Sequence, residues 1–155
     1  MAEVELKFDS GSAQKFFAEL WGNAKSVREM HDTYIRTISP IVFKDIIDHF
    51  KQEEGPTTRW HAWSAAYSKH MQRIGKGGNK ILQDSGFLRQ NVRATNFRKT
   101  SDGILFYNPA KTKGGFPYAA HHDETAGKPR SFMWLSQNVL SNIGELTLRF
   151  MLGKK

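Results

Sequence analysis

The run His121-His122-Asp123-Glu124 holds the side chains of this sequence that are best suited to bind a metal or to act as acid–base catalysts. Adjacent helical residues point about 100° apart, and the run has neither the H-x-x-x-H nor the H-E-x-x-H spacing of helical zinc sites. A metal would need further ligands from elsewhere, such as His61 or His70. We therefore expect no metal and no cofactor, and a histidine here that hydrogen-bonds the backbone.

The sequence also contains no motif that indicates nucleophilic catalysis. A serine hydrolase elbow needs G-x-S-x-G, which neither Gly11-Ser12 nor Ser85-Gly86 supplies. The sequence has no cysteine, which excludes disulfides, thiolate metal sites and a cysteine nucleophile. The segment 75–80 is rich in Gly and Lys but lacks the spacing of a phosphate-binding P-loop. We expect no catalytic residues, and an enzyme built on residues 121–124 is the weakest of three functional hypotheses.

Arg130, in Pro129-Arg130-Ser131-Phe132, is the charged residue best placed for recognition. A guanidinium can bind a carboxylate of a neighbouring subunit through two parallel hydrogen bonds. The alternative is an ordinary exposed arginine at the edge of a strand. A strand over 130–135 would have apolar residues on both faces, so both faces would be covered. The candidate subunit or partner interface comprises Lys76, Lys80, Lys111, Lys113, Tyr118, Arg130, Phe132 and Trp134.

The formal charge of +8 is unevenly distributed along the chain. Residues 51–100 hold ten Lys and Arg against three Asp and Glu, whereas residues 1–50 hold six against eight. A basic middle of this kind suits nucleic acid or an acidic protein surface. The alternative is a solvated face that aids solubility, because single surface charges cost little.

The length of 155 residues and the hydrophobic content of 39% predict one domain with a packed core. No apolar run approaches the ~20 residues of a membrane helix, and the first residues lack a signal-peptide pattern. We expect a soluble protein made in the cytoplasm, with no membrane partner.

The first half of the chain is expected to be mainly helical. Alternation of Val4, Leu6 and Phe8 with charged residues predicts a short strand, and helical spacing follows over about 12–72. Ser39-Pro40 predicts a new helix start, because Ser caps a helix and Pro is tolerated at its first position. In a helix over Thr58–Gln72, four large side chains would share one face that is core or subunit interface rather than a base-stacking platform. These are Trp60, Trp63, Tyr67 and Met71.

Residues 81–92 are predicted to be a hinge between a helical half and a sheet-containing half. Asp84 and Ser85 can cap a short helical turn. Phe87 and Leu88 are expected to point inward, with Arg89 and the following glutamine in solvent.

The second half is predicted to begin with a β-hairpin. Strands over 92–100 and 104–108 flank Ser101-Asp102-Gly103, a strong turn signal, and Lys99 is expected opposite Phe106. A helical turn over 118–122, a strand over 130–135 and a last helix capped by Ser136 and stopped by Gly153 complete the chain.

These elements predict an α+β fold over residues 1–155. A small antiparallel sheet, formed by the N-terminal strand, the hairpin and the late strand, would pack against several helices. The parts are a helical region of about 12–72, the hinge at 81–92, and the sheet with the last helix at 92–152. The core is expected in two clusters joined by the hinge, with Phe43, Ile47, Trp63, Leu88, Phe106, Phe132, Leu140, Ile143 and Leu146 mostly buried.

Two blocks of this sequence, in this order and spacing, resemble the virion morphogenesis (tail completion) family of Mu-like tailed bacteriophages. The first block is Leu82, Ser85-Gly86 and Leu88-Arg89, and the second is Tyr118-Ala119, His121 or His122, Pro129-Arg130 and Phe132. Gly55-Pro56 followed by Trp60 also resembles the family. The resemblance covers roughly residues 41–152 and departs in the longer loop after His122.

The resemblance implies a structural virion protein that completes the tail or the head-to-tail joint as a ring, often a hexamer. Its partners would be itself and other tail or neck proteins, with at most weak non-specific DNA contact. It would assemble in the host cytoplasm and end in the virion. The alternative, motivated by the basic middle and its aromatic residues, is a nucleic-acid-binding module.

Overall fold

The computed structural model describes the chain except for residues 1, 8–24, 84, 101–102, 126–129 and 152–155. Its α+β architecture combines a three-stranded antiparallel sheet of order β1-β3-β2 with five α-helices among the described residues. The elements are β1 (Ala2–Lys7), α2 (Lys25–Gln52), α3 (Ala65–Arg73), α4 (Phe87–Gln90), β2 (Phe97–Lys99), β3 (Gly103–Asn108), α5 (Tyr118–Ala120), the π-helical turn η1 (His121–Thr125) and α6 (Gln137–Met151). None of the described helices is long and apolar enough to span a bilayer.

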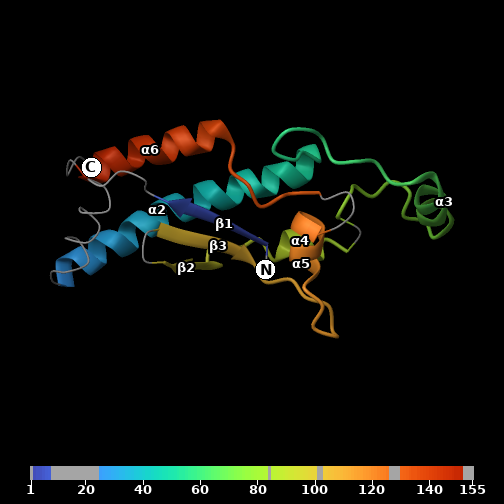
Figure 1. Cartoon of the computed structure of the whole chain (residues 1–155), viewed down its shortest axis with the longest axis horizontal. Coiled ribbons are helices and arrows are strands. Elements are labelled where there is room, and N and C mark those ends of the chain that lie inside the picture. The colour runs from blue at the N-terminus through green and yellow to red at the C-terminus, as the bar shows by residue number, and fades with distance from the viewer. Residues whose placement is uncertain (1, 8–24, 84, 101–102, 126–129, 152–155) are drawn as a thin grey trace.

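Helix α2 packs against α6 and against the sheet. Figure 1 shows it along the long axis of the molecule, with α6 beside it and α3 at one end, away from the body. The Phe43 ring of α2 meets the Phe106 ring of β3 edge to face, with centroids 5.5 Å apart. On α6, Thr147 donates its hydroxyl to the Ile143 carbonyl, so the Tyr34 hydroxyl is the donor in the 2.7 Å bond that joins α2 to Thr147.

The predicted helix start at Ser39-Pro40 is wrong, because α2 runs through both residues. Ser39 does not cap; its hydroxyl donates to the Ile35 carbonyl at 2.8 Å. A proline inside a helix costs about 3 kcal/mol through the missing N–H and its clash with the preceding turn. Buried side chains on both sides of Pro40, Ile38 and Val42 among them, outweigh that cost. The helix expected upstream, from residue 12, lies largely outside the described residues.

The β-hairpin is confirmed, but its predicted register and extent are wrong. Strand β2 begins at Phe97 rather than near Val92, and Lys99 pairs with Ile104 instead of Phe106. The predicted register would have placed residues 102 and 103 opposite each other, leaving no residues for a turn. In the observed register the Thr100 N–H donates to the Gly103 carbonyl at 3.0 Å, which leaves two residues to connect the strands.

The predicted late strand over 130–135 is wrong. We call residues 130–136 the anchored segment, because its backbone bonds to side chains of other elements rather than to a strand. Asp123 Oδ1 accepts the N–H groups of Phe132 and Met133 at 2.7 and 3.0 Å. Trp60 Nε1 donates to the Ser131 carbonyl at 2.9 Å. These backbone groups therefore need no strand partner.

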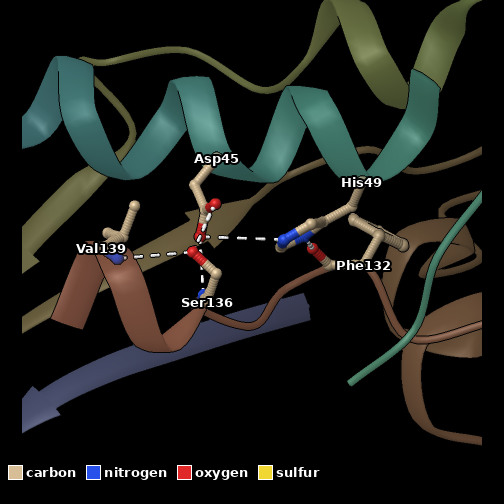
Figure 2. Close-up of polar contacts among 5 residues, drawn as sticks. All are labelled: Asp45, His49, Phe132, Ser136 and Val139. Atoms are coloured by element: carbon tan, nitrogen blue, oxygen red, sulfur yellow. Dashed lines mark hydrogen bonds and ion pairs between the residues drawn. The ribbon is translucent and has the colours of Figure 1, made fainter. Parts of the chain in front are cut away.

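Helix α2 also holds the anchored segment (Figure 2). His49 Nδ1 lies 3.1 Å from the Phe132 carbonyl, which can only accept, so this nitrogen carries a proton. Asp45 accepts the Ser136 N–H at 2.7 Å and the Ser136 hydroxyl at 2.9 Å. Ser136 Oγ then accepts the Val139 N–H at 3.4 Å, so the predicted cap of the last helix is confirmed.

Most buried hydrophobic residues form one cluster rather than the two predicted; Met71 and Leu105 lie outside it. Of the nine predicted core residues, five are buried: Phe43, Leu88, Phe106, Phe132 and Ile143. Ile47, Trp63 and Leu146 are half-buried and Leu140 is exposed. The cluster is continuous because α4 places Leu88 against the sheet, where Asn108 Nδ2 of β3 donates to the Leu88 carbonyl at 2.9 Å. The hinge is therefore part of the core.

We expect Asp45→Ala to lower the free energy of unfolding by about 2–3 kcal/mol. The substitution leaves two donors of Ser136 without their carboxylate and removes a negative charge from the N-terminus of α6. Chemical denaturation measures the change. Asp48→Ala is the matched control on the same helix, because Asp48 makes only an exposed pair with Lys51 and should cost under about 1 kcal/mol. An equal loss of unfolding free energy in the two variants would show that the Asp45 contacts do not stabilise the fold.

We expect Leu88→Ala to cost about 2–5 kcal/mol, because it opens a cavity where α4 meets the sheet. Its neighbour Phe87 was predicted to point inward but is 40% exposed, so Phe87→Ala is the control and should cost much less. Thermal or urea unfolding of the two variants compares them. A loss under half a kcal/mol for Leu88→Ala would place α4 at the periphery.

Candidate functional site

A cleft of about 730 Å³ lies between the segment that carries α3 and the body of the protein. We call residues 53–83 the arm; it leaves the C-terminal end of α2, includes α3 and returns to α2. The cleft is lined by Ala62, Trp63, Ser64, Tyr67, Lys80, Leu82, Ser85, Phe87, Leu88, Tyr118, His122 and Arg130. It has the volume of an ordinary ligand site and draws on four separate stretches of sequence.

The base of the arm is held by the last residues of α2. The α2 carbonyls of Phe50 and Lys51, which lie at the helix end, accept from the side chains of Gln83 and Lys80. The Glu53 carboxylate accepts the Ile81 N–H at 2.6 Å. The arm is therefore fixed at both ends, with Lys80 at its return.

The helix of the arm begins later than predicted. A helix over Thr58–Gln72 was expected, but α3 starts at Ala65, where Ser64 caps it by accepting the Tyr67 N–H. Trp60 lies upstream of α3 and is buried in the main core, with its ring against Phe50. The four aromatic and methionine side chains therefore do not share one face. Tyr67 and Trp63 meet edge to face at 5.4 Å and line the cleft.

Arg130 is held in place by a backbone carbonyl of the arm. Its Nε and Nη2 both donate to the His61 carbonyl at 3.2 Å, and its own N–H donates to the His122 carbonyl at 2.8 Å. Two bonds to one acceptor fix the plane of the guanidinium. No hydrogen bond joins the remaining guanidinium N–H groups to the described residues.

The described residues that line the cleft include Lys80 and Arg130 and no acid. Across the described part of the chain, neither Arg130 nor Lys80 forms an ion pair with a carboxylate. Burial lowers the pKa of His122 below its usual range, and the neighbouring His121 and Arg130 lower it further. His122 is therefore neutral at pH 7.

The structure brings some of the predicted interface residues together and separates others. Lys80, Tyr118 and Arg130 line the cleft. Lys76, Lys111 and Lys113 are exposed outside its lining. Phe132 is fully buried in the protein's own core, so its prediction as an interface side chain is wrong. It was placed on a strand face, whereas the anchored segment turns it inward against the Phe50 ring, 5.0 Å away.

Trp134 belongs to a buried stack rather than to an open face. Its indole lies parallel to the His49 imidazole, with centroids 3.9 Å apart and an interplanar angle of 3°. Trp134 Nε1 and His49 Nε2 are both buried and have no hydrogen-bond partner among the described residues. His49 Nε2 is 3.7 Å from Asp45 Oδ2, so this histidine couples the stack to the cap of α6.

Sequence reasoning missed the residues that position the site. Asp45, His49 and Asp123 hold the anchored segment that carries Arg130, but none of them belongs to a recognisable motif. The helical turn expected at 118–122 is confirmed by α5 and η1 and carries Tyr118 and His122, whose rings lie edge to face at 4.5 Å. Within the described ranges, no three His, Asp or Glu side chains are arranged to hold a metal ion.

No family model, curated protein or solved structure matches this chain.

We expect His122→Gln to reduce the loss of stability on acidification. Because the folded state lowers the pKa of His122, the unfolded chain takes up this proton first, from about pH 6.5 downward. Stability therefore falls as the pH drops through that value, until the folded form is protonated as well. Urea unfolding at pH 7.5 and pH 5.5 measures the difference. The exposed His70→Gln, on α3, is the control; an unchanged loss in His122→Gln would contradict the prediction.

Proposed function

We propose that this chain is a structural virion protein of a tailed bacteriophage that completes the tail or the head-to-tail joint by assembling into a ring. One observation supports this most directly. The residues that carry the resemblance to the tail completion family are far apart in the sequence, yet Leu88, Tyr118, His122 and Arg130 line one cleft. Short motifs that meet at one surface are what a shared binding or assembly function would require.

The exposed apolar side chains support assembly through two different surfaces. On the arm Ile74 is 48% exposed, and on α6 Leu148 is 59% exposed. Figure 1 places α3 and the C-terminal end of α6 at opposite ends of the molecule. A contact between two different patches is heterologous, and such contacts close into rings when the rotation allows. Burying these side chains would supply the association energy.

In this proposal the exposed lysines and the cleft face neighbouring subunits or other tail and neck proteins. Lys76, Lys80, Lys111 and Lys113 would meet acidic surfaces, and Arg130 and Tyr118 would contact a partner at the cleft. No catalysis, cofactor or membrane enters the function. Duplex DNA that passes through the ring would be bound weakly and without regard to sequence, because a conduit that gripped DNA would slow its passage.

The second candidate is a nucleic-acid-binding module, and charge is the observation that favours it. Residues 55–122 contain eleven Lys and Arg but only two acids, Asp84 and Asp102. A basic stretch of this kind is the electrostatic footprint of a polyanion binder.

We expect Ile74→Asp and Leu148→Asp each to convert the ring to monomer, because a buried unpaired carboxylate opposes association. Native mass spectrometry and light scattering measure the oligomer. An equimolar mixture of the two variants should stop at a dimer, since each variant keeps one intact surface of a heterologous contact.

Asn142→Asp, an exposed change on α6, is the matched control and should leave the ring intact. A wild-type chain that stays monomeric at high concentration and alongside candidate tail proteins would contradict the proposed function. A mixture that restores the complete ring would instead contradict the heterologous arrangement.

A further inference from the structure

The cations of the cleft form no ion pair with a carboxylate of the described residues. Most described carboxylates are already engaged: Glu3 with Arg98, Asp32 with Lys99, Asp48 with Lys51, and Asp45, Glu53 and Asp123 with backbone N–H groups. A second copy of the chain would bring these six carboxylates in the same engagements. An anion from a different molecule can complement Arg130 and Lys80 without breaking any of them.

The cleft also offers ring surfaces beside these cations. Tyr67 is 45% and Phe87 is 40% exposed, although both line a concave site, and Trp63 is half-buried next to Tyr67. Exposed aromatic side chains next to unpaired cations are the combination that binds unpaired bases and their phosphates. A fully stacked duplex would satisfy only the cations, because its base faces are covered.

We propose that the cleft binds a single-stranded segment of nucleic acid, with phosphates at Arg130 and Lys80 and a base stacked on the exposed ring of Tyr67 or Phe87. The guanidinium of Arg130 is already oriented by the His61 carbonyl, so it is preorganised for a phosphate oxygen. The Lys80 ammonium donates one hydrogen bond to the Lys51 carbonyl at the return of the arm, which positions it while leaving two of its three N–H groups for a phosphate. Exposed basic residues of the arm, Lys69, Arg73 and Lys76, extend the positive surface beyond the cleft.

Single-stranded binding goes beyond the proposed assembly function and does not depend on it. If the protein forms a ring but binds no single strand, only this inference is contradicted. If it binds a single strand but stays monomeric, only the proposed ring assembly is contradicted. The other chemistry that fits the cations is an acidic protein segment with an aromatic anchor. The observations favour nucleic acid, because an acidic segment needs one anchoring pocket whereas the cleft presents several partly exposed rings along a continuous basic stretch.

The test uses fluorescence anisotropy of the full chain with a labelled oligothymidine of about twelve nucleotides. At physiological salt the oligothymidine should bind more tightly than a duplex of the same length. Tyr67→Ala should weaken it roughly tenfold or more, as loss of one stacked base does. Lys80→Ala and Arg130→Gln should each lower the affinity and reduce the salt slope by about 0.7 per lost phosphate contact.

The controls are matched in type and lie outside the cleft. Phe116→Ala removes an aromatic ring that is 47% exposed, and Lys111→Ala removes an exposed cation. Both should keep affinity close to that of the unaltered chain. Arg130→Gln and Lys80→Ala also alter fold contacts, whereas the Tyr67 side chain is exposed, so Tyr67→Ala decides the outcome if either of them fails to fold.

Three results would overturn the inference. The first is no measurable oligothymidine binding, and the second is equal binding of duplex and single strand. The third is a loss in Phe116→Ala or Lys111→Ala as large as in Tyr67→Ala or Lys80→Ala, which would show diffuse charge attraction. Binding of a labelled polyglutamate peptide that depends on Tyr67, without binding of oligothymidine, would assign the cleft to an acidic protein instead.

Discussion

The carboxylates of Asp45 and Asp123 hold the anchored segment, and the rest of the site depends on them. Each accepts two hydrogen bonds, and three of the four come from backbone N–H groups. A buried backbone segment that lies outside helices and sheets needs other hydrogen-bond partners for its polar groups. Charged acceptors provide stronger hydrogen bonds than neutral ones. The segment they fix carries Phe132 into the core, Arg130 to the cleft and Ser136 to the start of α6. One irregular stretch thus joins the core, the cleft and the last helix.

Helix α2 supplies the frame for this arrangement. It tolerates Pro40 because buried side chains on either side of the proline keep the helix packed against the sheet and α6. Its C-terminal carbonyls receive Lys80 and Gln83, which closes the arm, and its Asp45 and His49 reach the anchored segment (Figure 2). Ring assembly and single-strand binding would both act through elements that α2 positions. A destabilised α2 should therefore impair both.

Charge distribution separates the two surfaces that these proposals use. The cleft and the arm lie in the basic part of the chain, whereas the exposed apolar residue Leu148 lies on α6 at the other end of the molecule. Apolar patches at opposite ends suit repeated contacts between copies. A cleft with two cations and no acid among its described lining residues suits an anion from another molecule. The patches at Ile74 and Leu148 can serve assembly while the cleft serves a ligand.

The sequence by itself determined the α+β class, the hairpin, the cap at Ser136 and the basic character of the middle. Each follows from local chemistry: the Asp-Gly turn signal, a serine before an apolar helical stripe, and the count of charges. Only the tertiary structure decided that α2 continues through Pro40, because packing on distant elements outweighed the local preference for a break. It also decided that residues 130–135 form no strand, because side chains of Asp123, Trp60 and His49 took the place of a neighbouring strand. Phe132, predicted as an interface residue, became core for the same reason, while Lys80, Tyr118 and Arg130 met at one cleft through contacts between residues far apart in sequence.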